Sequence, residues 1–243
     1  MTYHNRHECK FAVPEAVAAR VLHRVRPFVR PDPHAETRPG HTYPIASLYL
    51  DDEVRSLYRE TIEGRAQRFK LRIRAYDDAP DSLVFLEVKR RRDRVVQKLR
   101  CPVPRTALPA LLGGTDPDVP GLRPSHRPAL REFLRLLQLQ RATPRLIVRY
   151  DREAYVGYDD DEVRVTVDRR LAVSAEAGPH VRLGEGHFEP LALRGVVLEL
   201  KFNDRCPPWI ADVVRACELQ RTSFSKYCRS FDILEEHGRV APA

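Results

Sequence analysis

One stretch of alternating basic and apolar residues restricts the fold more than any other feature of this sequence. The segment Arg68–Ala75 reads Arg-Phe-Lys-Leu-Arg-Ile-Arg-Ala. In a β-strand, residues two apart point to the same face, so this segment predicts a strand with one basic face and one apolar face. Matching alternation recurs at Glu87–Lys89, Lys98–Arg100, Arg164–Asp168 and Glu199–Lys201. The sequence therefore predicts a sheet whose strands repeat one charged face.

The other patterns predict further strands, joined mostly by short turns, and several amphipathic helices. The expected strands are 6–13, 45–50, 68–76, 82–89, 95–103, 145–151, 153–158, 162–168 and 195–202. The segments 145–151 and 153–158 are parts of one long or bent strand, or a bulged pair. The expected helices cover 14–28, 54–60, 128–137, 208–220 and 225–236. These elements predict an α+β fold, a closed antiparallel β-barrel with helices packed outside.

The repeated charged face admits two arrangements of the sheet. Either the sheet is open and the charged face meets water, or the sheet closes and the charged face lines a lumen. Four like charges at spacing two are costly unless an anion lies among them. Arginine predominates here, and its planar fork suits bidentate binding of phosphate. We therefore favour the lumen.

Charge and composition narrow the class of partner. The net charge is +8, which favours nucleic acid, a membrane surface or a phosphorylated small molecule. Arg68–Ala75 is interleaved with apolar rather than aromatic residues, which argues against nucleic acid because few bases could stack. No apolar run approaches the roughly 18 residues of a membrane span, and no membrane partner is indicated. The 5 scattered cysteines predict a reducing, cytoplasmic location.

Three glutamates precede a lysine by two positions, namely Glu8, Glu87 and Glu199. An inward-facing carboxylate among phosphates is repulsive unless it holds a cation or orients a basic side chain. Hard divalent cations prefer oxygen ligands, so Glu199 is a candidate ligand for Mn²⁺ or Mg²⁺, completed by phosphate oxygens and water. For Glu8 and Glu87, a salt bridge to neighbouring lysines is an equal alternative.

Eight short motifs resemble one known family in their order along the chain. They are Arg6-x-Glu8-x-Lys10-Phe11, Tyr49-Leu50-Asp51-Asp52, Lys70-Leu71-Arg72-Ile73-Arg74-x-Tyr76, Leu86-Glu87-Val88-Lys89, Tyr150-x-Arg152-x-Ala154-Tyr155, Arg164-x-Thr166-x-Asp168, Leu198-Glu199-x-Lys201 and Phe224-Ser225-Lys226-Tyr227. The chain resembles the VTC domain, the polyphosphate polymerase module of the triphosphate tunnel metalloenzyme (CYTH-like) superfamily. The resemblance covers about residues 3–233 and implies a single domain over 1–243 with a short C-terminal tail.

The resemblance implies a basic tunnel that binds triphosphate and polyphosphate with a divalent metal, Mn²⁺ or Mg²⁺. The implied catalytic residues are Arg72, Arg74, Lys89, Arg152, Arg164 and Lys226. The implied substrate-binding residues are Lys10, Lys70, Lys98, Tyr150, Ser225 and Lys201. Glu199 is the implied metal ligand.

Two positions depart from the family pattern. Arg6 stands where the triphosphatase branch carries the first glutamate of Glu-x-Glu-x-Lys, which argues against plain triphosphate hydrolysis because a metal-coordinating carboxylate is lost. Thr222-Ser223 stands where eukaryotic polymerases carry a lysine.

The expected function is polyphosphate polymerase activity, in which the γ-phosphate of ATP is transferred to a growing chain. The nucleophile, a terminal phosphate, is already anionic, so positioning and charge neutralisation suffice. The alternatives are a metal-dependent triphosphatase or polyphosphate hydrolase, and a non-catalytic polyphosphate-binding module.

Overall fold

The computed structural model describes residues 6–92, 95–114, 119–184 and 186–240. The described chain forms two compact units. Unit 1 comprises the described residues of Met1–Pro44, Tyr150–Leu171 and Pro190–Ser225; unit 2 comprises those of Ile45–Arg149, Ala172–Glu189 and Lys226–Ala243. Two strands, β7 (Thr143–Gly157) and β8 (Arg164–Ala175), contribute residues to both units. The single domain expected over residues 1–243 stays a prediction.

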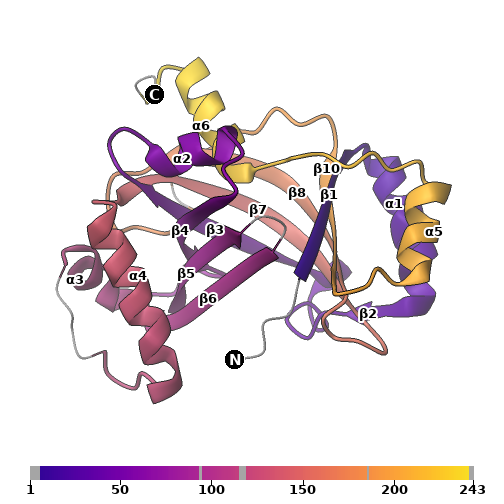
Figure 1. Ribbon diagram of the computed structural model, residues 1–243, viewed down its shortest axis with the longest axis horizontal. Coiled ribbons are helices and arrows are strands. Elements are labelled where there is room, and N and C mark those ends of the chain that lie inside the picture. The colour runs from indigo at the N-terminus through magenta and orange to yellow at the C-terminus, as the bar shows by residue number, and fades with distance from the viewer. Residues whose placement is uncertain (1–5, 93–94, 115–118, 185, 241–243) are drawn as a thin grey trace. The chain divides into compact units, whose positions relative to one another are not determined.

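The described residues contain ten strands and six α-helices. The other strands are β1 (Arg6–Val13), β2 (Val29–Pro31), β3 (Thr42–Asp51), β4 (Gln67–Ala75), β5 (Leu83–Arg92), β6 (Val95–Pro104), β9 (Glu189–Pro190) and β10 (Val196–Asn203). The helices are α1 (Glu15–Val25), α2 (Ser56–Ile62), α3 (Leu108–Leu112), α4 (Arg127–Leu139), α5 (Pro208–Ala216) and α6 (Lys226–Glu236). Figure 1 labels most of these elements. Within the described residues, no helix has the length and apolar character that crossing a bilayer requires.

The strands follow the order β1-β10-β8-β7-β3-β4-β5-β6, with β2 beside β7 and β9 beside β8. The registered pairings are antiparallel. The α+β class and the antiparallel sheet are thus confirmed. The predicted closure of the sheet into a barrel is not found in the described chain, where β1 and β6 are the two ends of the strand order. The outer edge of β1 receives a backbone hydrogen bond from Thr222 N to Lys10 O at 2.8 Å. In β6, Pro102 and Pro104 lack the N–H donors that continued pairing needs.

Unit 2 builds its core from the apolar faces of β3 to β6. Leu71 and Ile73, which alternate with the basic residues of β4, are completely buried in this core. Helix α4 packs on β5 and β6 (Figure 1), and buries Phe133 and Leu137. Pro128 lies in its first turn, where no intrahelical N–H donor is lost. Helix α4 therefore covers the apolar faces of β5 and β6.

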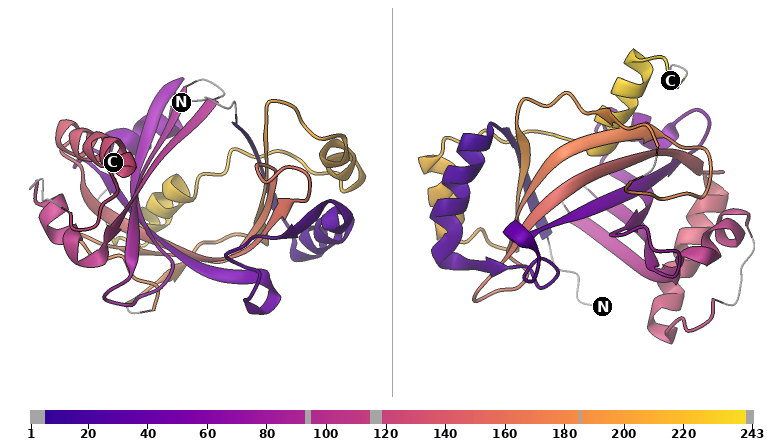
Figure 2. Two further views of the ribbon diagram at one scale, coloured as in Figure 1. Left: turned by 90° about the horizontal axis from the view of Figure 1, so that it is seen from below. Right: turned by 180° about the vertical axis from the view of Figure 1, so that it is seen from behind.

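Unit 1 has a separate core beneath α1 and α5. The two helices lie side by side in both views of Figure 2. Val21 of α1 and Ile210 of α5 pack with Leu198 and Leu200 of β10. The odd residues of β10 thereby point to the opposite face, which carries Glu199 and Lys201.

Strand β7 agrees with one of the alternatives left open by the sequence, and strand β8 differs from the sequence expectation. The segments 145–151 and 153–158 belong to one strand, β7. Strand β8 continues to Ala175, well beyond the expected end at residue 168. Arg170 has φ of 50°, a left-handed conformation that interrupts the regular alternation and hides the continuation from a period-two pattern.

Candidate functional site

In unit 1, strand register brings the charged faces of β1, β10 and β8 into rows. Lys10 lies opposite Glu199, and Glu199 lies opposite Thr166. One row along, Glu8 lies opposite Lys201, and Lys201 lies opposite Arg164. Acidic and basic residues therefore alternate across the strands as well as along them.

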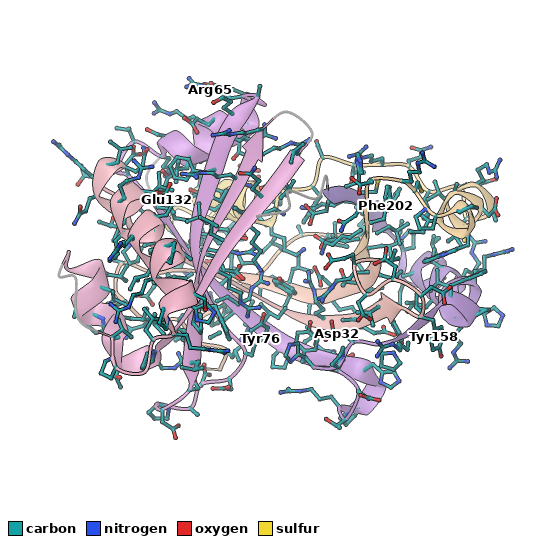
Figure 3. All side chains as sticks on the ribbon, turned by 60° about the horizontal axis from the view of Figure 1, so that its bottom comes forward. Asp32, Arg65, Tyr76, Glu132, Tyr158 and Phe202 are labelled. Carbon is teal, nitrogen blue, oxygen red and sulfur yellow. The ribbon has the colours of Figure 1, made fainter. Side chains whose placement is uncertain are left out.

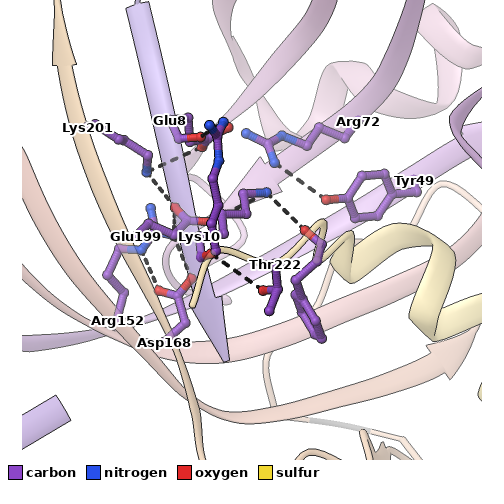
Figure 4. Close-up of polar contacts among 11 residues, drawn as sticks. Glu8, Lys10, Tyr49, Arg72, Arg152, Asp168, Glu199, Lys201 and Thr222 are labelled. Carbon is purple, nitrogen blue, oxygen red and sulfur yellow. Dashed lines mark hydrogen bonds and ion pairs between the residues drawn. The ribbon is translucent and has the colours of Figure 1, made fainter. Parts of the chain in front are cut away.

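Glu199 is the centre of this arrangement (Figure 4). Its Oε2 lies 2.5 Å from Lys201 Nζ and 3.4 Å from Arg152 Nη2, and its Oε1 lies 3.7 Å from Lys10 Nζ. The residue is only 3 % exposed. Three cations thus converge on one buried carboxylate.

Arg152 is clamped by a second carboxylate. Its Nε and Nη2 donate to Asp168 Oδ1 and Oδ2, both at 2.7 Å. Its guanidinium also lies 5.3 Å from the centroid of the Tyr150 ring. Burial acts to lower the pKa of Arg152, but Asp168, Tyr150 and Glu199 outweigh it and hold the pKa well above its usual value. We define the Glu199 cluster as Glu8, Lys10, Arg152, Asp168, Glu199 and Lys201.

Lys201 is the titratable cation of the Glu199 cluster. Burial lowers its pKa to about 8, with Arg152 acting in the same direction, while Glu199 and Glu8 oppose the shift. Its Nζ lies 3.7 Å from Glu8 Oε1. Lys201 therefore changes charge just above neutral pH, where arginine neighbours do not.

Two other predicted residues of unit 1 lie around the Glu199 cluster without a described contact to Glu199. Arg164 Nη1 lies 3.2 Å from Asp32 Oδ2, a carboxylate that is 2 % exposed. Ser225 directly precedes α6 and follows Phe224, whose carbonyl accepts a 3.2 Å hydrogen bond from Lys10 Nζ.

In unit 2, the corresponding centre is Glu87 on β5. Its Oε2 lies 2.6 Å from Arg72 Nε and 3.9 Å from Arg74 Nε. Its Oε1 lies 2.5 Å from Lys98 Nζ and 3.5 Å from Arg100 Nε. We define the Glu87 cluster as these five residues. Glu87 is completely buried and Arg74 is 6 % exposed, whereas the side chains of Lys98 and Arg100 are partly exposed.

The electrostatics of the Glu87 cluster follow from its excess of cations. Burial acts to raise the pKa of Glu87, but Arg72, Arg74 and Lys98 hold it well below its usual range. The pKa of Lys98 is lowered well below its usual value, first by burial and then by Arg74 and Arg72, against the attraction of Glu87. The described ion pairs of the Glu87 cluster therefore hold more positive than negative charge.

Sequence reasoning missed Tyr49 as a residue of this site. Arg72 Nη1 donates to Tyr49 Oη at 3.4 Å, and the Tyr49 ring stacks on Tyr227 with centroids 4.8 Å apart. Burial acts to raise the pKa of Tyr49, but Arg72, Arg74 and Lys226 lower it below the usual value. The signal available in the sequence was the motif Tyr49–Asp52 directly before a turn.

The remaining predicted residues of unit 2 flank the Glu87 cluster. Lys89 lies opposite Lys70 on one side and Lys98 on the other. Lys70 Nζ lies 5.3 Å from the Tyr227 ring centroid. Lys226 begins α6 and is 8 % exposed.

Sequence reasoning missed Asp168 as a carboxylate that orients a cation, and it left the role of Glu87 open between two alternatives. Asp168 is completely buried and appeared only as part of the Arg164–Asp168 alternation. For Glu87 the alternatives were metal binding or salt bridges, and its described contacts are with cations. Asp168 and Glu87 each belong to a segment with charged residues two positions apart. The sequence of one strand does not say which residues of the neighbouring strands they contact.

The donor set around Glu199 fits only one kind of metal site. Within the described residues, no group of three or more His, Cys, Asp or Glu side chains could hold a metal ion. Both oxygens of Glu199 already face ammonium or guanidinium groups. Glu199 therefore fits a divalent cation held mainly by substrate phosphates and water, with a single protein carboxylate.

Comparison with solved structures shows similarity in fold at low sequence identity. A candidate adenylate cyclase from Bacillus halodurans aligns with a TM-score of 0.50 and 11% identity, covering 91% of this chain and 95% of that chain. A candidate adenylyl cyclase from Hippeastrum, described as having a dominant triphosphatase activity, has 12% identity, 98% coverage of both chains and a TM-score of 0.49. A Pyrococcus horikoshii OT3 protein has 13% identity, coverage of 95% and 99%, and a TM-score of 0.46.

The family itself is established from the sequence. No curated protein matches the chain. The VTC domain model matches residues 5–235, a range that includes β1 to α6 and both clusters. This match confirms the family inferred from the eight motifs. The chain belongs to the VTC domain family.

Proposed function

We propose that this chain is a polyphosphate polymerase that transfers the γ-phosphate of ATP to a growing inorganic polyphosphate chain. Membership of the VTC domain family supports phosphoryl chemistry on phosphate chains. The observation that carries the proposal is the Glu87 cluster, where four cations surround one buried carboxylate. Such an excess of positive charge is stabilised by a bound polyanion.

The arginines of both clusters suit phosphate oxygens. Guanidinium groups bind phosphate in a bidentate way, and their charge does not depend on pH near neutrality. We propose that Arg72, Arg74, Lys89, Arg152, Arg164 and Lys226 stabilise the transferred phosphoryl group. We propose that Lys10, Lys70, Lys98, Tyr150, Ser225 and Lys201 hold the rest of the substrate.

The proposed reaction needs no general base. The terminal phosphate of the acceptor chain is already ionised at neutral pH, so its oxygen attacks the γ-phosphorus of ATP and the bond to the bridging oxygen of ADP breaks. Neither cluster contains a histidine or cysteine. The side chains of the chain therefore act by positioning the two phosphates and by neutralising their charge.

Glu199 is the proposed ligand for the divalent cation, Mn²⁺ or Mg²⁺. When bound, the ion supplies positive charge to the phosphate oxygens. Lys10, Lys201 and Arg152 keep Glu199 oriented and ionised through their contacts with its oxygens.

The test is incubation of the purified chain with ATP and Mn²⁺, followed by electrophoresis for long-chain polyphosphate. A ladder of products that disappears on chelation of the metal supports the polymerase. Release of orthophosphate alone identifies a hydrolase, and binding of polyphosphate without turnover identifies a binding module. The Glu199→Gln variant separates the last case, because a pure binder keeps its affinity for polyphosphate and has no turnover to lose.

A further inference from the structure

The charged face of β4, β5 and β6 forms an uninterrupted stripe within unit 2. Register runs without a bulge from Gln67 opposite Arg92 to Arg74 opposite Phe85, and from Arg92 opposite Val95 to Leu83 opposite Pro104. Residues two apart therefore share the face of Glu87. We define the basic stripe as Arg68, Lys70, Arg72, Arg74, Lys89, Arg91, Lys98 and Arg100.

Glu87 is the only carboxylate among the described residues on this face of the three strands. Its row contains Arg72 and Arg100 as the residues opposite it. The next row toward the β5–β6 turn contains Lys70, Lys89 and Lys98. The row after that places Arg68 opposite Arg91. Positive charge thus continues for two rows beyond the carboxylate.

Exposure increases along the basic stripe in the same direction. Arg74 is buried, Arg72, Lys70 and Arg68 are half-buried, and Arg91 is exposed. Arg65, which lies just before β4, and Tyr76, which lies just after it, mark the two ends of the strand in Figure 3. The stripe therefore leads from the Glu87 cluster to an accessible end.

The exposed end shows the electrostatic cost of this arrangement. Like charges directly opposite each other in a sheet are destabilising. The pKa of Arg68 is lowered from its usual value, first by partial burial and then by Arg91. Arg68 Nη1 also donates to the carbonyl of Arg65, which holds it at the strand end. An anion at this row would relieve the repulsion.

We propose that Arg68 and Arg91 form an outer subsite that makes this protein bind phosphate chains longer than triphosphate more tightly than triphosphate itself. The inference rests on the proposed binding of phosphate chains. The Arg68 and Arg72 rows are four residues apart, about 14 Å at the antiparallel rise per residue. A chain of many phosphates spans both rows at once, whereas a triphosphate at the Glu87 cluster is too short to cover them both. Each additional row then adds contacts only for the longer ligand.

The test compares two ligands on the full chain without ATP, long-chain inorganic polyphosphate and tripolyphosphate, by titration calorimetry at fixed ionic strength. The double variant Arg68→Gln/Arg91→Gln should lose about tenfold in affinity for the long chain, the order expected for two partly screened charges, and keep its affinity for tripolyphosphate. The matched control is Arg92→Gln/Arg131→Gln. It removes the same charge from the opposite face of β5 and from α4, where both residues are exposed.

The outcomes distinguish the subsite from the proposed function. Equal loss for both ligands, or an equal effect of the control, overturns the outer subsite and leaves phosphate binding intact. Failure of the unmodified chain to bind either ligand overturns both proposals. The variant Arg68→Lys/Arg91→Lys keeps both charges and should restore most of the preference for the long chain, and a lack of restoration would overturn the charge-based outer subsite.

Discussion

The Glu199 cluster and the Glu87 cluster use the same local pattern to different effect. In both, a buried glutamate on one strand meets cations on its neighbours. In the Glu199 cluster, Glu8, Asp168 and Glu199 face three cations, so the charges balance. In the Glu87 cluster, one carboxylate faces four cations. The described ion pairs of the first cluster balance in charge, and those of the second leave an excess of positive charge.

The difference in charge balance between the two clusters bears on the proposed binding of phosphate chains. A balanced network holds each side chain in one place, as the bidentate pair of Arg152 and Asp168 shows. A cation-rich network attracts phosphate but is held together poorly by its own contacts. We infer that the Glu87 cluster gives most of the affinity and that the Glu199 cluster gives most of the orientation.

The largest expected effect is on stability when Arg152 is replaced by alanine. This change leaves Asp168, which is completely buried, and Glu199 without their shared cation. Breaking a buried pair costs about 3–5 kcal/mol of unfolding free energy, to be measured by urea denaturation. The control Arg30→Ala removes an exposed pair with Asp161 and should cost less than about 1 kcal/mol. Equal losses for the two variants would contradict the view of a tight balanced network.

A second large effect is expected for Glu87→Gln. The variant leaves four cations without their carboxylate, and we expect a loss of about 3–5 kcal/mol at low salt. Because the remaining charge is all positive, added inorganic phosphate should recover part of the stability, whereas it should not recover Arg152→Ala. The control is Glu132→Gln. Glu132 lies in α4 and accepts hydrogen bonds from Arg135 of the same helix and from Arg90 of β5. Recovery of both large variants by phosphate would erase the distinction between the clusters.

A smaller and separable effect is expected for Lys98→Gln. The Lys98 side chain is 37 % exposed, so its ion pair with Glu87 is partly screened by water and removal should change the unfolding free energy by less than about 1 kcal/mol. Affinity for tripolyphosphate should fall about tenfold, as for a charged hydrogen-bond donor. Calorimetry and denaturation of the same sample measure both quantities. A large loss of stability with unchanged affinity would assign Lys98 a structural role.

The smallest effect is a pH dependence from the Glu199 cluster. Lys201 has its pKa lowered to about 8, so it is charged below that pH and neutral above it. Phosphate groups have already lost their second proton near pH 6, so affinity for tripolyphosphate should fall by several-fold between pH 7 and pH 9 through Lys201. Lys201→Arg keeps its charge and should show a flat profile. The same slope in both proteins would assign the titration to another group.

The fold was readable from the sequence where period-two alternation is regular. Arg68–Ala75 became β4, with Leu71 and Ile73 in the core as expected. The extension of β8 was missed because Arg170, with φ of 50°, breaks the alternation. The prediction of a closed barrel was wrong for the described chain, because the pattern within a strand does not say whether the first and last strands of a sheet pair with each other.

The sequence predicted which residues belong to the candidate site, but it did not predict which of them contact one another. Lys10, Arg152, Glu199 and Lys201 were singled out, and they share contacts. That Asp168 clamps Arg152 depends on the pairing of β7 with β8. Likewise, Tyr49 reaches Arg72 only because β3 pairs with β4. Such neighbours come from register, which a single strand does not encode.

The pairing of β1 with β10 has a consequence for how the chain folds. Lys10 pairs with Glu199, so β1 is synthesised long before its partner exists. Strands β4, β5 and β6 pair with neighbours close in sequence, and contacts between nearby residues form faster than distant ones. We expect hydrogen-exchange pulse labelling to protect β4–β6 before β1. Strand β1 would then stay unpaired until β10 has been synthesised and could pair with it.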